Sequence, residues 1–86
     1  MLQLLRFHAT WCTPCKQLAP VVEQVKTETG VPVQDIDVDK EHDMVDKYGV
    51  RGVPTLILLK DGEPVQRMAG YQTKERIIAM INEAKG

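Results

Sequence analysis

The chain contains only two cysteines, Cys12 and Cys15, and two residues separate them. A secreted scaffold held together by disulfides usually has about four or more cysteines, spread along the chain so that they join distant segments. A bridge between Cys12 and Cys15 closes a very small loop, so it restricts the unfolded chain little and stabilises the fold only weakly. The pair therefore indicates redox chemistry or metal binding rather than a structural cross-link.

Metal binding is the less favoured of these two interpretations, because structural zinc sites usually need about four ligands. The two histidines, His8 and His42, could complete such a site only if the fold brought them to the cysteines. The acidic residues between positions 37 and 43 lack the glycine and the spaced glutamate of a calcium loop. We therefore expect no metal and interpret these acidic residues as solvated turn and cap residues.

The elements predicted around the cysteines explain how the pair could act. Residues 2–7 predict a buried strand, and the helical spacing of apolar residues from 18 to 25 predicts a helix that begins near the cysteines. Free amide groups and the helix dipole stabilise an anion there, so Cys12 is expected to attack a disulfide as a thiolate. Cys15, one turn further along and less exposed, would then attack Cys12 and release the reduced partner. Pro14 suits the first helical turn, where the amide proton that it lacks would have no partner.

The remaining elements follow from periodicity and from turn residues. Pro20 is expected to bend the first helix without breaking it. In chain order, the pattern predicts a strand at 2–7, a helix ended by Gly30, a strand near 33–38, a helix near 42–48 ended by Gly49, a strand at 55–60, a turn at 61–62, a strand near 65–69 and a helix capped by Thr73. This β-α-β-α-β-β-α order predicts an α/β fold with a mixed sheet whose first two strands are parallel. Because Pro64 has no amide donor, the last strand should lie at an edge of the sheet.

Composition and charge restrict the classes of function. The 86 residues suit one domain, 1–86, and the hydrophobic fraction of 43% is ordinary for a globular protein. The formal net charge of −1 and the scattered lysines and arginines argue against a nucleic-acid-binding surface or an anionic-membrane surface. No segment has the pattern of a signal peptide or approaches the ~20 apolar residues of a membrane span. We expect a cytoplasmic monomer that binds neither nucleic acid nor membranes.

Several segments, in the same order, resemble the thioredoxin family. Residues 11–16, Trp-Cys-Thr-Pro-Cys-Lys, are similar to the family's active-site segment, which usually has glycine in place of the threonine. Residues 47–55 resemble the segment around its cis-proline, residues 60–63 resemble its hairpin, and Gly70 matches the glycine before its last helix. Thioredoxins are themselves a known case of an activated Cys-x-x-Cys thiolate. The resemblance implies a protein dithiol–disulfide oxidoreductase.

The resemblance also implies the details of the fold. The chain begins at what would be the second strand of a typical thioredoxin, so the family's N-terminal strand and helix are absent from it. The expected fold is a four-stranded mixed sheet in the order 2-1-3-4 with three flanking helices. The Val53–Pro54 peptide bond is expected to be cis, which would turn the Val53 backbone toward Cys12, where it can pair with an extended substrate segment.

Site residues, cofactors and partners are likewise implied by the resemblance. The residues expected to bind substrate in a shallow groove are Trp11, Thr13, Pro14, Val53, Pro54, Gly70 and Tyr71. No bound cofactor is expected, since the redox group would be the Cys12–Cys15 disulfide itself. The expected partners are disulfide-containing protein substrates and a thioredoxin reductase, which would supply reducing equivalents from NADPH.

The chain departs from the family pattern in and beneath the active site. Thr13 replaces the usual glycine, and His8 replaces a usual tryptophan. Where thioredoxins have a buried aspartate paired with a lysine, this chain has Arg6 and Asp35, so the charges are exchanged. Because an unpaired buried guanidinium would be very costly, Arg6 is expected to pair with Asp35. Arg6 could then favour the thiolate of Cys15 while Asp35 accepts its proton, or the pair could merely satisfy the core.

Other functions stay open from the sequence. The chain could be a dedicated hydrogen donor, for example to ribonucleotide reductase, or a glutaredoxin-like protein recharged by glutathione. Glutaredoxins usually carry Cys-Pro-Tyr-Cys and a Gly-Gly pair, and this sequence has neither. The non-enzymatic alternative is a thioredoxin-fold subunit that serves as a scaffold for another enzyme. Reduction of insulin with dithiothreitol as the electron source would separate an enzyme from a scaffold.

Overall fold

The structure, a computed structural model, describes residues 1–86. Its elements are β1 (Leu2–His8), α1 (Thr13–Thr29), β2 (Val33–Asp37), α2 (His42–Tyr48), β3 (Thr55–Lys60), β4 (Glu63–Ala69) and α3 (Lys74–Lys85). This order along the chain confirms the predicted β-α-β-α-β-β-α arrangement. Helix α1 continues through Pro20, as expected, and ends where Gly30 adopts a left-handed conformation with φ of 73°.

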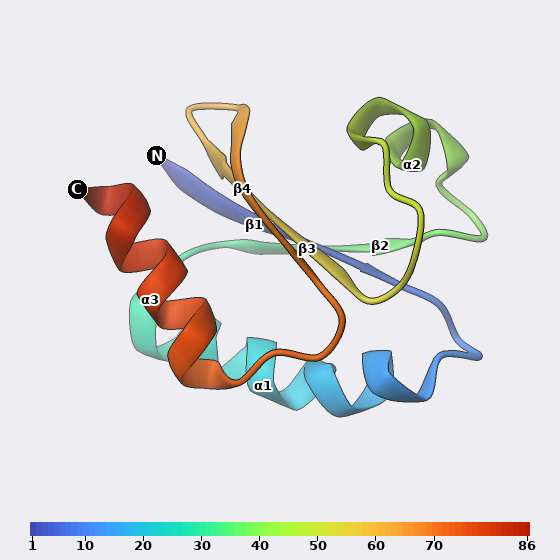
Figure 1. The fold of residues 1–86 in the computed structure, drawn as a ribbon, viewed down its shortest axis with the longest axis horizontal. Helices are drawn as coiled ribbons and strands as arrows, with labels where there is room; N and C mark the ends of the chain where they lie inside the picture. Colours follow the sequence, from blue (N-terminus) through green and yellow to red (C-terminus); the bar gives the residue numbers. More distant parts are fainter.

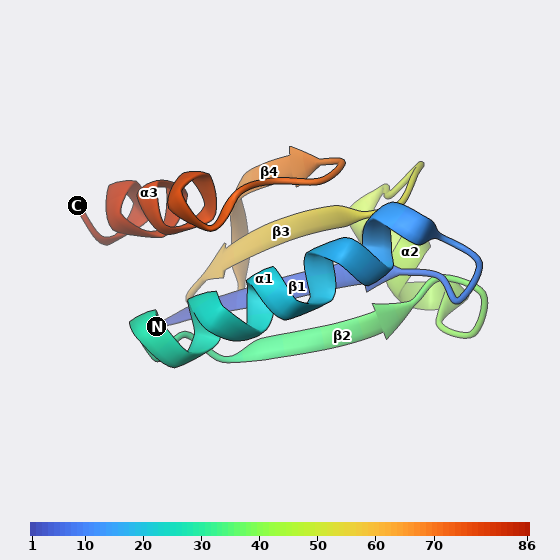
Figure 2. The same ribbon diagram turned by 90° about the horizontal axis from the view of Figure 1, so that it is seen from below.

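The four strands form one mixed sheet in the order β2-β1-β3-β4, which confirms the predicted order 2-1-3-4. Strand β1 is parallel to β2 and antiparallel to β3, and β4 is antiparallel to β3 at the sheet edge. The helices lie on both sides of the sheet, with α1 and α3 covering one face and α2 lying on the other (Figure 1). The parallel β1–α1–β2 unit brings the start of α1 close to the end of β1 (Figure 2).

Strand β4 begins two residues earlier than the sequence predicted. Asp61 and Gly62 both have positive φ, 53° and 85°, so the turn needs only these two residues and pairing resumes directly between Lys60 and Glu63. The register then shifts at Leu59, which pairs with Pro64. The irregularity accommodates a residue without an amide donor on an edge strand.

The sheet separates two hydrophobic clusters, because alternate strand residues face opposite sides. The cluster beneath α1 and α3 contains Leu4, Leu18, Val22, Val25, Val31, Leu56, Leu58, Ile77, Met80 and Ile81. The cluster beneath α2 contains Leu5, Phe7, Ile36, Val50, Ile57 and Leu59. Burying a side chain of this size contributes roughly 1.5–3 kcal/mol, so both faces of this small sheet contribute to stability.

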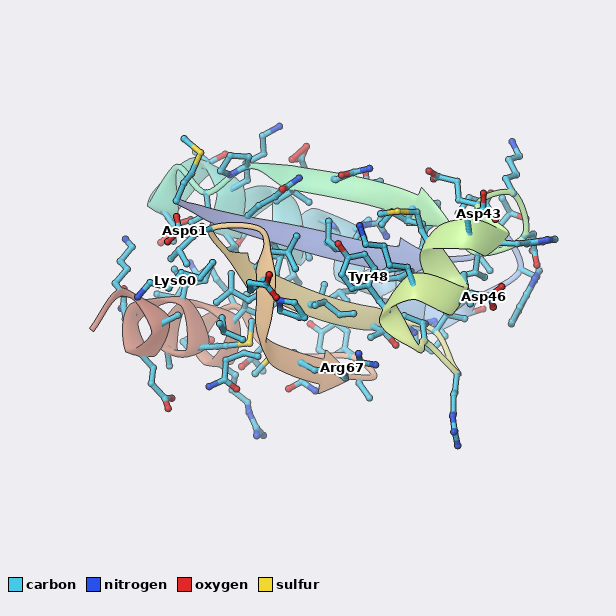
Figure 3. All side chains as sticks on the ribbon, turned by 90° about the horizontal axis from the view of Figure 1, so that it is seen from above. Asp43, Asp46, Tyr48, Lys60, Asp61 and Arg67 are labelled. Carbon is cyan, nitrogen blue, oxygen red and sulfur yellow. A yellow bond between two sulfur atoms is a disulfide. The ribbon has the colours of Figure 1, made fainter.

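Contacts from Tyr48 and Arg67 fix α2 against the sheet. The Tyr48 ring packs edge to face on Phe7 with 6.2 Å between ring centroids. The Arg67 guanidinium, from β4, donates to the carbonyl of Tyr48 and to that of Gly49, where α2 ends (Figure 3). A cation at a helix C-terminus also interacts favourably with the helix dipole. These contacts hold the loop that follows α2, and this loop leads to Pro54.

Candidate active site

Cys12 and Cys15 form a disulfide at the N-terminus of α1, with 5.3 Å between their Cα atoms. Cys12 is the N-cap residue, and its sulfur accepts a hydrogen bond from the backbone amide of Cys15 at 3.2 Å. Pro14 occupies the first helical turn, as the sequence predicted. The start of α1 thus presents an amide donor and the positive end of the helix dipole to the Cys12 sulfur, an arrangement that stabilises a thiolate.

The exposed fractions of Cys12 and Cys15 differ less than the sequence predicted. Cys15 is 2% exposed and Cys12 is 5% exposed, so both are buried in the disulfide form. They pack together with Ala9, and Val38 and Val53 contact this small cluster. Only a small part of the Cys12 surface is therefore accessible to a partner sulfur. The neighbouring Trp11 side chain is 68% exposed.

The Val53–Pro54 peptide bond is cis, as the resemblance implied. The carbonyl of Pro54 accepts a hydrogen bond from the amide of Gly70 at 2.9 Å, which joins the residue before β3 to the residue after β4. Tyr71 follows and is 49% exposed. Val38 and Val53 both contact the cluster of Ala9, Cys12 and Cys15. The structure thus brings three segments that are far apart in the sequence together around one disulfide.

Two shallow cavities lie next to Val53. One, of about 270 Å³, is lined by Trp11, Val38, Val45, Val50, Arg51, Gly52 and Val53. The other, of about 430 Å³, is lined by Gly49, Arg51, Gly52, Val53, Pro54, Thr55, Arg67, Ala69 and Gly70. Among the residues expected to bind substrate, Trp11, Val53, Pro54 and Gly70 therefore line these cavities, whereas Thr13, Pro14 and Tyr71 line neither.

Trp11 is held by a contact that the local sequence pattern does not predict. Its indole Nε1 donates a hydrogen bond to Asp39 Oδ2 at 2.9 Å. Asp39 in turn donates its backbone amide to Asp37 Oδ1 at 2.9 Å, which sets the turn after β2. From the sequence, Asp39 is expected only to be a solvated turn residue. The parallel pairing of β1 and β2 was the available signal, because residues that follow both strands meet at the same end of the sheet.

Arg6 and Asp35 form the expected ion pair, with 2.7 Å between Arg6 Nε and Asp35 Oδ1. The Arg6 side chain is 11% exposed and the Asp35 side chain is 58% exposed, so the carboxylate faces water. The pair lines a cavity of about 90 Å³ together with Ala19, Val22, Glu23, Lys26 and Val33. Neither cysteine lines this cavity. An effect of the pair on Cys15 would therefore be transmitted through the helix or through the field of the charges.

No group of three or more histidine, cysteine or acidic residues lies close enough together to hold a metal ion. His8 ends β1 and His42 begins α2. No helix of the structure is both long enough and apolar enough to cross a membrane.

Comparison with known proteins gives consistent similarities. The thioredoxin family model matches residues 1–83. The chain is 43% identical over 82 residues to thioredoxin of Bacillus subtilis (strain 168), covering 93% of this chain and 79% of that protein. It is 41% identical over 83 residues to a Staphylococcus aureus thioredoxin, covering 94% of this chain and 80% of that protein. The structure resembles a mutant thioredoxin from Halobacterium salinarum NRC-1 with a TM-score of 0.92 and 43% identity, covering 95% of this chain and 73% of that chain.

Proposed function

We propose that this chain, which belongs to the thioredoxin family and is a thiol–disulfide oxidoreductase, reduces the disulfides of other proteins. In this reaction Cys12 is the attacking residue and Cys15 is the resolving residue. The observation that carries this assignment is the Cys12–Cys15 disulfide at the start of α1. Cys12 is the N-cap residue and receives the amide hydrogen bond, so it is the sulfur that the helix terminus stabilises as an anion.

The first step joins the enzyme to its substrate. In the reduced enzyme, the Cys12 thiolate attacks one sulfur of a substrate disulfide, and a new S–S bond forms as the substrate S–S bond breaks. The departing substrate sulfur carries the electron pair of the broken bond and takes up a proton. Backbone hydrogen bonds from Val53 hold the extended substrate segment, and Trp11 forms an apolar wall beside it.

The second step releases the substrate. The Cys15 thiol loses its proton, and the thiolate attacks Cys12 Sγ as the bond between Cys12 and the substrate sulfur breaks. The second substrate sulfur then leaves and is protonated. The substrate has gained an electron pair and two protons, and the enzyme holds the Cys12–Cys15 disulfide that the structure contains.

The remaining site residues have supporting roles in this proposal. Pro54 and Gly70, joined by a hydrogen bond, shape the substrate-binding edge, and Thr13, Pro14 and Tyr71 contribute exposed surface around the disulfide. Arg6 favours the thiolate of Cys15 through its positive charge. Asp35 is bound to the guanidinium and is largely exposed, which supports a role in holding Arg6 over direct proton transfer with Cys15.

Reducing equivalents come from NADPH through a thioredoxin reductase, and the protein works as a cytoplasmic monomer with one domain, 1–86. The family's usual partners support this part of the proposal, and the absence of the glutaredoxin sequence features supports it over recharging by glutathione. The test is insulin reduction with three electron sources: dithiothreitol, NADPH with thioredoxin reductase, and NADPH with glutathione and its reductase. Activity with the first two sources is expected. Activity with glutathione alone would support the glutaredoxin-like alternative, and inactivity with all three would support a scaffold.

A further inference from the structure

The residues of β1 alternate between the two faces of the sheet. Leu4 belongs to the cluster beneath α1 and α3, whereas Leu5 and Phe7 belong to the cluster beneath α2. The alternation places Arg6 and His8 on the same side as Leu4. Arg6 confirms this placement because it lines the cavity against α1. His8 is therefore the last residue of β1 on the side that α1 covers, and it is half-buried.

The level of His8 along α1 follows from that of Arg6. The N-terminus of α1 lies near the C-terminal end of β1, so the helix runs back along the strand (Figure 2). Arg6 lies level with the stretch of α1 from Ala19 to Lys26, whose residues Ala19, Val22, Glu23 and Lys26 line the same cavity. Two strand residues advance about 6.6 Å and one helical turn advances about 5.4 Å. An advance of about 6.6 Å corresponds to about four helical residues, so His8 is level with the stretch of α1 from about Cys15 to Val22, and Cys15 is the buried cysteine of that stretch.

The partner of His8 on β2 is Asp37. The parallel register pairs Arg6 with Asp35 and His8 with Asp37, and the first of these pairs is joined by an ion pair. Asp37 is half-buried, and its Oδ1 accepts the amide of Asp39, which leaves Oδ2 without a protein partner. The imidazole of His8 makes no hydrogen bond within the protein. The charged groups on the elements around His8 are Arg6 on its own strand, Asp35 and Asp37 on β2, Lys16, Glu23, Lys26 and Glu28 on α1, and Asp39 and Lys40 in the turn after β2.

We propose that His8 accepts the proton of Cys15 in the resolving step, with Asp37 stabilising the imidazolium that forms. This inference rests on the disulfide exchange proposed above. A proton passes from Cys15 Sγ to an imidazole nitrogen, the thiolate forms a bond to Cys12 Sγ, and the bond from Cys12 to the substrate sulfur breaks. The departing substrate thiolate takes up a proton, which His8 can return. Imidazole suits this role because it gains and loses a proton near neutral pH.

A single-turnover reaction with 5,5′-dithiobis(2-nitrobenzoate) separates the two steps, with reduced enzyme in excess. Attack by Cys12 releases the first coloured thiolate, and attack by Cys15 on the mixed disulfide releases the second. The variant His8→Gln keeps a hydrogen-bonding side chain that does not titrate. We expect it to release the first thiolate at the wild-type rate and the second about tenfold or more slowly at neutral pH, since general bases contribute roughly 10²–10⁴-fold. The matched control is His42→Gln, an exposed histidine, which should change neither phase.

Asp37→Asn provides a second test that does not remove the histidine. Without the carboxylate the imidazolium is less stable, so the pH midpoint of the second phase should move lower while the first phase is unchanged. Equal slowing of both phases would indicate a purely structural role and overturn the inference. An unchanged second phase in His8→Gln, or slowing in Asp35→Asn alone, would also overturn it. If wild-type enzyme fails to release two thiolates in two phases, the proposed disulfide exchange itself fails.

Discussion

The indole Nε1 of Trp11 donates a hydrogen bond to Asp39 Oδ2 at 2.9 Å and so joins the loop before α1 to the turn after β2. Trp11 is 68% exposed and stands beside Cys12, so without this bond its side chain would be free to adopt several rotamers. The contact holds an exposed apolar side chain in place beside Cys12. The position of this side chain therefore depends on a residue 28 positions away in the sequence.

Replacing Asp39 with alanine should free the Trp11 ring and weaken substrate binding. A hydrogen bond to a charged group is worth about 1.5–3 kcal/mol when buried and less at an exposed site, so KM for insulin should rise by a few fold with kcat nearly unchanged. Trp11 is the only tryptophan, so a fall in fluorescence anisotropy would report its mobility directly. The matched control is Asp43→Ala, which removes an exposed acidic residue of α2. An unchanged anisotropy in Asp39→Ala would contradict the prediction.

Single serine substitutions should separate the roles of the two cysteines. Cys12→Ser removes the attacking sulfur, so no adduct with a disulfide substrate is expected. Cys15→Ser removes the resolving sulfur, so the mixed disulfide between Cys12 and the substrate should accumulate. Mass spectrometry under non-reducing conditions measures the adduct in both variants. Accumulation in Cys12→Ser instead would reverse the assignment of the two residues.

The Arg6–Asp35 pair predicts an asymmetry in stability. Asp35→Ala leaves a mostly buried guanidinium without its partner, which should lower the free energy of unfolding by about 1 kcal/mol, since the exposure of Asp35 lets water replace part of the contact. Arg6→Met keeps the apolar volume and removes the charge, so its effect should be smaller. Urea denaturation of the oxidised proteins measures both values. A larger loss of stability in Arg6→Met than in Asp35→Ala would contradict the predicted asymmetry.

The ion pair between Lys74 and Glu28 predicts a stability difference that depends on pH. A hydrogen bond from Lys74 to the Glu28 carboxylate, 2.9 Å long, and the charge of Glu28 raise the pKa of Lys74 above its ordinary 10.5. A group with a raised pKa in the folded state contributes stability below its unfolded pKa, and this contribution is lost as pH rises through the folded pKa. The Tm difference between wild type and Glu28→Gln should therefore be constant near neutral pH and change only above about pH 10.5.

Thermal unfolding monitored by circular dichroism at several pH values measures this difference. Glu23→Gln is the matched control, because Glu23 lies exposed on the same helix and forms no ion pair in the structure. Its Tm difference from wild type should show no change in the alkaline range. A Tm difference for Glu28→Gln that stays constant through the alkaline range would mean that the pair with Lys74 is not formed in solution.

Local patterns in the sequence determined the elements and the order in which they occur. The 3.6-residue and two-residue periods, the glycine after α1 and Thr73 at the start of α3 act within a few residues of one another, so they could be recognised without knowledge of the fold. The Cys12–Cys15 pair is also a local feature, because a separation of three positions at the start of a helix is enough to bring the two sulfurs together. The cis geometry at Pro54 came from family resemblance, since no local pattern specifies it.

Tertiary structure alone decided which side chains meet from different elements. The bond from Trp11 to Asp39 and the pairing of His8 with Asp37 depend on strand register and on where the loops at the ends of the strands lie. The exposure of Asp35 and the burial of Cys12 depend on how much of each residue the neighbouring elements cover. Periodicity tells which face of an element is buried, but it carries no information on how far one element is displaced along another. That displacement is fixed only when the helices pack against the sheet and form the two hydrophobic clusters.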